Sequence, residues 1–261
     1  MKHLIFIIAF LIAPLTQAAP TFTNINSQDF EDISKEMAAN FTHNSMLGAA
    51  KMGSLLGVQV GLVAASTATP KTNDIVKRNS GAELSNIYNA GLLVAVGIPF
   101  GIAFEGVLLP ETKASGASFS VTSLAVKYNI NDVIPVLPLN LALRGFYSTA
   151  NFKFDQTVSS VNSSVENKTT VSGVQLLLSP MTPLIDPYVG VGVVNASNTL
   201  EASGSAIFDP SYTSSQSESK NLTGTQILAG VDLNLLLIKI GAEYSQAFGT
   251  SKYGLKLAVG F

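Results

Sequence analysis

The chain has 261 residues, of which 12% are charged and none is cysteine, and its formal net charge is −2. A charged fraction about half that of an ordinary soluble domain argues against a soluble protein with a fully hydrated surface. The lack of cysteine excludes disulfides and thiol chemistry, and the small net charge argues against a nucleic-acid partner.

Residues 1–18 have the pattern of a secretory signal peptide. Lys2 provides a charged start, residues 4–13 are apolar, and Thr16 to Ala18 place small residues before a cleavage site after Ala18. A short membrane anchor is the alternative, but the apolar run is shorter than the roughly 20 residues of a spanning helix. The pattern predicts export and a mature chain that begins near Ala19.

Residues 19–56 are expected to form a separate N-terminal segment that contains a helix at 27–41. Ser27 is a candidate cap, and acidic residues in the first turns suit the helix dipole. We expect this helix to lie at the periplasmic end of a barrel, where it is a possible plug for the mouth. Its apolar face, at spacings of three and four, consists of Phe30, Ile33, Met37 and Phe41.

From residue 57 to residue 261, apolar side chains alternate with small or polar ones, which predicts β-strands. The clearest alternation is at the end of the chain, where every second residue from Tyr253 is apolar. The predicted strands are 57–66, 86–97, 100–109, 118–128, 139–151, 169–179, 187–199, 222–235, 236–247 and 252–261.

This alternation is typical of a membrane barrel, in which one face meets lipid and the other meets the lumen. A soluble β-sandwich also alternates, but its polar face usually carries many charged side chains, whereas Gly, Ala and Ser dominate here. Residues 91–109 are almost entirely apolar, which leaves a helical inner-membrane protein as a second alternative. Pro99 and four glycines favour two strands instead.

The connections between the predicted strands alternate in length. The segments 67–85, 155–168 and 200–221 are long and polar, whereas the others are short, as expected of barrels with outer loops and periplasmic turns. The segment 86–97 is the least regular strand, and without it both the strand count and the parity fail. The sequence therefore predicts an all-β fold, a transmembrane antiparallel up-and-down β-barrel of about ten strands with a short N-terminal helix.

The ending YGLKLAVGF resembles the C-terminal strand of bacterial outer-membrane β-barrel proteins. The helix ahead of glycine-rich strands is also similar to a poorly characterised group of these proteins with an N-terminal helix before the barrel. The resemblance implies location in the outer membrane, contact with its lipid, and insertion by the barrel assembly machinery. The matching residues of this assembly signal are Tyr253, Leu255, Leu257, Val259 and Phe261.

Seven charged residues are expected to point into the lumen, because a Lys or Arg that faces lipid at the midplane costs about 2–4 kcal/mol. They form either interior salt bridges in a packed barrel or the lining of a water-filled pore. Lys239, Glu243 and Lys256 lie on the last two predicted strands and are expected to form one cluster. The full set is Glu105, Lys127, Arg144, Asp232, Lys239, Glu243 and Lys256.

Catalytic chemistry is not predicted. His43 is the only histidine outside the signal peptide, and we expect it to be a polar surface residue behind the helix. A serine or aspartate nucleophile therefore lacks a base, and with no cysteine a metal site or other cofactor is not expected.

Two functions remain open at this stage. The chain is either a small channel or transporter for solutes or hydrophobic compounds, or a non-conducting structural or surface-interaction barrel with a packed lumen. Ten strands make a barrel only slightly wider than the eight-stranded size that side chains fill. The sequence indicates neither a substrate nor an oligomeric state.

Overall fold

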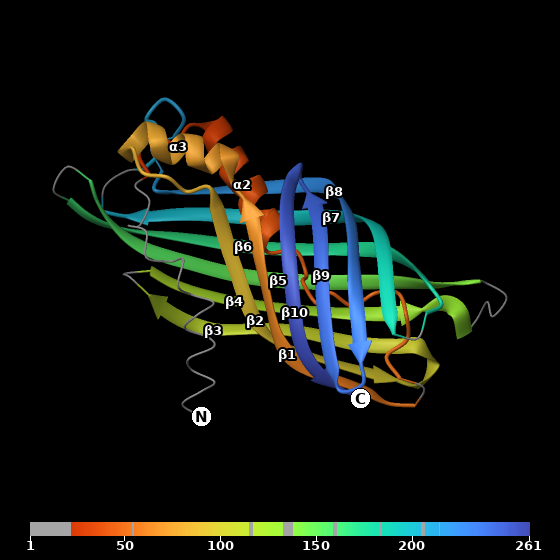
Figure 1. The fold of residues 1–261 in the computed structure, drawn as a ribbon. Helices are drawn as coiled ribbons and strands as arrows, with labels where there is room; N and C mark the ends of the chain where they lie inside the picture. Colours follow the sequence, from red (N-terminus) through yellow and green to blue (C-terminus); the bar gives the residue numbers. More distant parts are fainter. Residues whose placement is uncertain are drawn as a thin grey trace.

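The computed structural model is a closed barrel of ten antiparallel strands, in which each strand pairs with its sequence neighbours and β1 pairs with β10 (Figure 1). This confirms the predicted fold class, and the least regular segment, 86–97, forms strand β2. The strands are β1 (Gly57–Ala68), β2 (Asn86–Ile98), β3 (Ile102–Ala114), β4 (Ala117–Asn129), β5 (Leu139–Val158), β6 (Val161–Pro180), β7 (Ile185–Ser203), β8 (Ser217–Leu235), β9 (Ile238–Ala247) and β10 (Thr250–Gly260).

The structure describes residues 22–53, 55–114, 117–132, 138–158, 161–182, 184–204, 207–213 and 215–261. The predicted signal peptide lies outside these residues.

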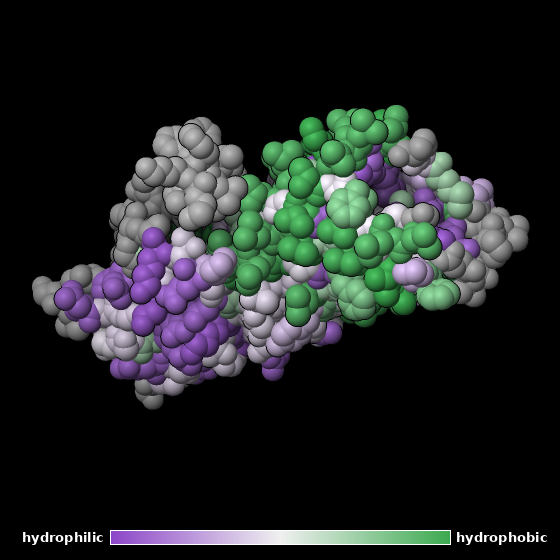
Figure 2. Space-filling view, turned by 90° about the horizontal axis from the view of Figure 1, so that it is seen from below, coloured by the Kyte–Doolittle hydropathy of each residue, from purple (hydrophilic) through white to green (hydrophobic). Residues whose placement is uncertain are grey.

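The alternation in the sequence becomes the inner and outer faces of the barrel wall. On β10 the side chains of Leu255, Leu257 and Val259 are exposed, whereas those of Lys256 and Ala258 are buried in the lumen. The same alternation holds along β7. Figure 2 shows the result, a broad apolar band on one half of the molecule and polar side chains gathered on the other half.

The barrel has two distinct ends. At the turn end, residues 99–101 join β2 to β3 and Leu236 and Leu237 join β8 to β9, and the C-terminus lies beside them. At the loop end, a helix joins β1 to β2 and residues 204–216 join β7 to β8.

Strands β5 to β8 have 19 or 20 residues each, whereas β9 and β10 have 10 and 11. The long strands extend past the short ones at the loop end (Figure 1). The expected polar connection at 155–168 is therefore wrong, because most of it forms the paired ends of β5 and β6. The expected connection at 200–221 is shorter, since β7 continues to Ser203 and β8 begins at Ser217.

Two α-helices accompany the barrel. Helix α2 (Ser27–Asn40) matches the expected range, but its cap is Asn26 and not Ser27, because the Asn26 side chain accepts from the backbone of Asp29 and the Asp29 side chain accepts from the backbone of Asn26. Helix α3 (Pro70–Ser80) was not predicted. It starts on a proline and ends before Gly81, whose φ of 68° suits a glycine.

None of the helices in the described part of the chain is long and apolar enough to cross a membrane. The apolar stretch 91–109 forms parts of β2 and β3, which excludes the helical alternative for that stretch.

Helix α2 lies inside the barrel at the loop end, which corrects its expected position at the end that holds the C-terminus. Its apolar face packs into the largest core cluster, together with inward side chains of β4 to β7 and residues of the 204–216 connection. Phe30 contacts Phe208, and Phe41 contacts Phe119. Residue 25 forms a single bridge to residue 208. From α2 the chain descends through the lumen and reaches β1 at the turn end.

Candidate functional site

Residues 22–50, here called the N-terminal segment, run through the lumen from the loop end to the turn end. After α2 they form no strand ladder, so their backbone groups need other partners. Side chains of the barrel wall donate hydrogen bonds to the carbonyl oxygen of Thr42 and to those of residues 46–50. The pairs are Lys252 to Thr42 (2.9 Å), Lys256 to Met46 (2.9 Å), Arg144 to Leu47 (3.3 Å), Lys127 to Gly48 (2.7 Å) and Ala50 (3.1 Å), and Asn129 to Ala49 (2.7 Å).

Glycines let the N-terminal segment approach the wall closely. A Cβ at Gly48 would lie 2.1 Å from Asp186 Oδ2, and a Cβ at Gly254 would lie 2.7 Å from Met46 Cε. Each of these contacts is far inside van der Waals distance, so a larger side chain would have to displace the segment or its neighbours. On β10, Lys252 and Lys256 thus donate to carbonyl oxygens of the segment, and Gly254 between them leaves space for Met46.

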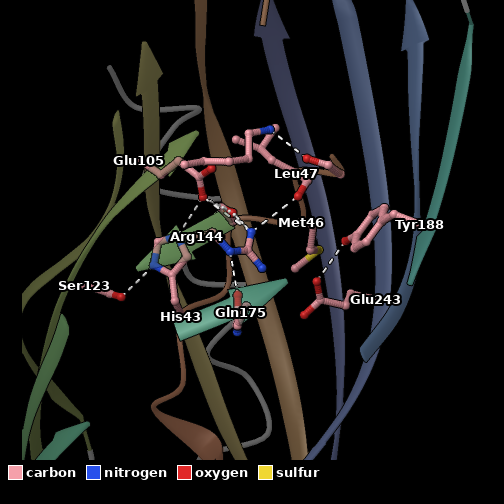
Figure 3. A network of polar contacts seen from close by, with 12 residues as sticks. His43, Met46, Leu47, Glu105, Ser123, Arg144, Gln175, Tyr188 and Glu243 are labelled. Carbon is pink, nitrogen blue, oxygen red and sulfur yellow. Dashed lines mark hydrogen bonds and ion pairs between the residues drawn. The ribbon is translucent and has the colours of Figure 1, made fainter. Parts of the chain in front are cut away.

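The centre of the lumen holds a polar network around Glu105 (Figure 3). The carboxylate Oε2 of Glu105 lies 3.0 Å from His43 Nε2 and 3.5 Å from Arg144 Nη1, and it also accepts from Ser45. Arg144 additionally donates to Gln175 at 2.6 Å. The Glu105 and His43 side chains are fully buried and that of Arg144 is 1% exposed, so this charge pair has no access to water to compensate its desolvation.

The same network contains a serine–histidine–carboxylate arrangement. Because an ionised carboxylate only accepts, His43 Nε2 donates to Glu105, and in the neutral imidazole His43 Nδ1 then accepts from Ser123 at 2.8 Å. These residue types in this order also form hydrolase triads. Here Ser123 lies behind the N-terminal segment that carries His43, and both side chains are buried. If the segment moved aside to admit a substrate, the histidine would move with it, so the geometry supports a structural role.

Two further pairs lie closer to β8, β9 and β10. Lys256 Nζ is 2.8 Å from Asp232 Oδ2, and the Tyr188 hydroxyl donates to Glu243 at 2.8 Å. The expected cluster of Lys239, Glu243 and Lys256 is therefore not formed, since the last two have separate partners. Lys239 shares their inward register but is only half-buried, because it lies next to the turn end.

The Glu36 carboxylate of α2 binds the N-terminus of α3. Thr69 caps α3 without a side-chain hydrogen bond, and the Glu36 carboxylate accepts instead from the backbone of Lys71 and Thr72, at 2.9 Å each. Burial raises the pKa of the Glu36 carboxyl, and the hydrogen bonds from Thr72 oppose this rise. At the rim, hydrogen bonds from Lys220 and Lys35 lower the pKa of Glu31 to about 2.

The structure places six of the seven predicted lumen charges in the buried interior, and Lys239 at its edge. The four residues of the possible plug, Phe30, Ile33, Met37 and Phe41, are buried at the loop end. The expectation that His43 is a polar surface residue is wrong, because its side chain is buried between Ser123 and Glu105. Sequence reasoning missed Tyr188 and Lys252. Lys252 lies within the predicted strand 252–261 and has the same parity as Lys256, so the alternation placed it on the inner face, whereas His43 is on no strand and gave no periodic signal.

No group of His, Cys, Asp and Glu side chains among the described residues has the arrangement of a metal site.

A family model described as "Family of unknown function (DUF6588)" matches residues 7–259 of the chain. No curated protein sequence matches this chain. Among solved structures, the attachment invasion locus protein Ail of Yersinia pestis is 13% identical with a TM-score of 0.35, and the match covers 79% of this chain and 97% of Ail.

The translocator domain of the autotransporter NalP from Neisseria meningitidis is also 13% identical, with a TM-score of 0.48 and coverage of 80% of this chain and 88% of that domain. The outer membrane protease OmpT of Escherichia coli is 9% identical, with a TM-score of 0.41 and coverage of 78% and 95%. These outer-membrane barrels have different roles and do not indicate one function for this chain.

Proposed function

The chain belongs to this family of unknown function, and we propose that it is a bacterial outer-membrane barrel which its own N-terminal segment keeps closed. In this role the barrel conducts no solute at rest. The loop-end parts of its long strands extend beyond the membrane, with α2 packed inside them. The observation that supports this proposal best is the set of wall side chains that bind the carbonyl groups of Thr42 and of residues 46–50.

The outer face of the barrel supports a membrane location. Exposed charged side chains gather near the loop end, for example Lys113, Lys153 and Lys168, whereas the rest of the wall exposes apolar ones. Such a band is what lipid requires, since charge at its centre is costly. Its members include Val60, Leu92, Val94, Phe104, Leu108, Leu124, Val126, Leu143, Tyr147, Val174, Leu176, Val189, Val191, Val193, Ile227, Ile240, Tyr253, Leu255, Leu257 and Val259.

The width of the barrel supports the closed state. Side chains fill a barrel of about eight strands, whereas barrels of 16 or more leave an aqueous channel. Ten strands leave room for one additional chain, and residues 41–50 occupy it with hydrogen bonds to the surrounding wall. Above them, α2 closes the loop end with an apolar core. Water-filled passage would require breaking both layers.

Recording from planar bilayers tests this proposal with the full chain. The unaltered protein is expected to show no stable conductance, because the N-terminal segment fills the lumen. Lys252→Met combined with Lys256→Met removes two wall donors to the segment and is expected to produce transient openings. Lys153→Met combined with Lys168→Met, which changes exposed lysines on β5 and β6, is the matched control and should remain silent. A stable open channel from the unaltered protein would contradict the proposal.

A gated channel is the second candidate, and the polarity of the wall favours it. If the N-terminal segment left the lumen, Lys127, Arg144, Lys252 and Lys256 would face Glu105, Asp232 and Glu243 across a polar passage. A solute path of this kind fits small polar solutes better than hydrophobic compounds. The burial of Ser123 and His43 behind the N-terminal segment supports a role other than enzyme catalysis.

The proposed orientation places the C-terminal strand's end in the periplasm and the loop end outside the cell. The strand from Tyr253 to Phe261 is then the segment that the barrel assembly machinery would bind. Because the N-terminal segment crosses the whole lumen, its two ends should lie on opposite sides of the membrane.

Cysteine labelling tests this orientation, and the chain has no cysteine of its own. Gln28→Cys places an exposed thiol at the start of α2, and Lys51→Cys places one at the turn end. A membrane-impermeant maleimide should label Gln28→Cys on intact cells, and should label Lys51→Cys only after the outer membrane is permeabilised. The reverse pattern would contradict the orientation.

A further inference from the structure

The turn end of the barrel is unusually apolar for a surface in water. Leu236 is 90% exposed, Phe100 79%, Leu55 76% and Phe261 75%. These residues are close neighbours in the order of the strands, because the turns of β2–β3 and β8–β9 flank the start of β1 and the end of β10. We call these exposed turn-end residues the apolar rim: Leu55, Leu56, Phe100, Leu236, Leu237 and Phe261.

Two rim residues combine an unusual backbone conformation with a highly exposed side chain. Phe100 has a φ of 70° and Leu236 a φ of 55°, a region that bulky side chains rarely adopt. Such a conformation persists where the surrounding structure holds it in place. Phe248, in the turn between β9 and β10, has a φ of 53° but packs against the apolar core around α2. Phe100 and Leu236 expose most of their surface instead, so each tight turn presents a bulky apolar side chain at a position where glycine would be less strained.

Strand length indicates what covers the rim. Tyr253 and Tyr244 are directly opposite each other, with ring centroids 5.2 Å apart, and mark the upper aromatic boundary of the apolar band on β10 and β9. The eight steps from Tyr253 to Phe261 cover about 26 Å along the strand, which is about 19 Å of depth at a tilt of about 45°. The apolar band of an outer-membrane barrel is about 25 Å tall. Its lower edge therefore lies beyond the strand ends, at the turns.

We propose that the apolar rim lies within the membrane, at the boundary between the phospholipid headgroups and acyl chains of the periplasmic leaflet. Leu236, Leu237 and Phe100 then anchor the seam side of the barrel in lipid, and the apolar wall continues into the rim without a polar interval. This inference rests on the proposed membrane location and adds the depth at which the barrel sits.

The chain contains no tryptophan, so a single introduced tryptophan reports its own surroundings. Leu236→Trp and Phe100→Trp probe the rim, and the second variant serves if the first does not fold. Leu257→Trp, at a 59% exposed site in the middle of the band, is the membrane control, and Ser211→Trp, at an exposed site of the 204–216 connection, is the water control. Each full-length protein is reconstituted in phosphatidylcholine vesicles whose acyl chains carry bromine near or far from the headgroup, and aqueous acrylamide is added separately.

We expect rim tryptophans to lose fluorescence to bromine near the headgroup and to be shielded from acrylamide. Leu257→Trp should lose more to the deeper bromine, and Ser211→Trp should respond only to acrylamide. Rim tryptophans that behave like Ser211→Trp, while Leu257→Trp is quenched by bromine, would overturn the inference and leave the membrane location intact. Rim tryptophans shielded from both quenchers would also overturn it, because a second copy of the chain would then cover the rim. A Leu257→Trp that bromine does not quench would overturn the membrane location itself.

Discussion

Gly61→Val is expected to prevent the barrel from closing. Gly61 on β1 lies opposite Ala258 on β10, at the seam where the first and last strands pair. A Cβ at position 61 would lie 2.3 Å from the carbonyl oxygen of Leu257 and 2.4 Å from both Cα and Cβ of Ala258. Because two of these atoms are backbone, no side-chain rotation relieves the contact, and the strands must separate. Each seam hydrogen bond lost in this way costs about 1 kcal/mol in water, and more in lipid.

Gly145→Val is the matched control, since it makes the same change on β5 where a Cβ would meet nothing within 4 Å. Folded outer-membrane barrels migrate faster on unheated gels than after boiling, so the fraction of fast-migrating protein measures closure. Gly145→Val should retain that species, and Gly61→Val should lack it. A Gly61→Val protein that folds as completely as the control would show that the seam is wider than the structure indicates.

The strands could be predicted because lipid and lumen impose one simple rule on every residue of the wall. On β10, Leu255 and Leu257 face outward because lipid favours apolar side chains, and Lys256 faces inward because lipid excludes charge. The sequence therefore shows a period of two. The outward face meets a uniform solvent, so no knowledge of neighbouring strands was needed. The predicted strands consequently fall within about two residues of the observed ones except at the loop end.

The long strands exceeded the prediction because their loop-end halves obey a different rule. Beyond the membrane the outer face meets water, so Lys153 and Lys168 are exposed there, while Phe154 and Val165 face α2. Polar outer residues with serine and threonine between them resemble a loop by composition. Only the packing of α2 against the inner face makes these residues a sheet, and that contact is between segments far apart in the sequence.

The lumen was the least predictable part. His43 has no periodic neighbours, and its burial depends on Glu105 and Ser123, which are 62 and 80 residues away. The apolar face of α2 indicated that this side of the helix would be buried, but it did not indicate at which end of the barrel the helix would lie. Helix α3 was missed because its sequence is polar, and it depends on Glu36 of α2 for acceptors at its first turn.

Arg144→Met is expected to lower the free energy of unfolding by about 3–5 kcal/mol, because removal of one partner leaves a buried charge uncompensated. Arg144 is a fully buried cation of the wall that donates to the Leu47 carbonyl of the N-terminal segment and lies 3.5 Å from Glu105. After the substitution, the donors to Glu105 among the described residues are His43 and Ser45.

Combining Arg144→Met with Glu105→Gln separates charge from packing. The glutamine keeps a side chain of similar shape for His43 and carries no charge, so the double variant should lose less than the sum of the two single losses, by about 1–3 kcal/mol. Reversible urea unfolding in lipid vesicles measures all four proteins on one scale. Additive losses would mean that Arg144 stabilises the barrel through its hydrogen bonds to Gln175, Ser45 and the Leu47 carbonyl and not through the Glu105 charge. In that case the N-terminal segment would be held by its backbone contacts, and the Glu105 charge would not be needed to keep the lumen closed.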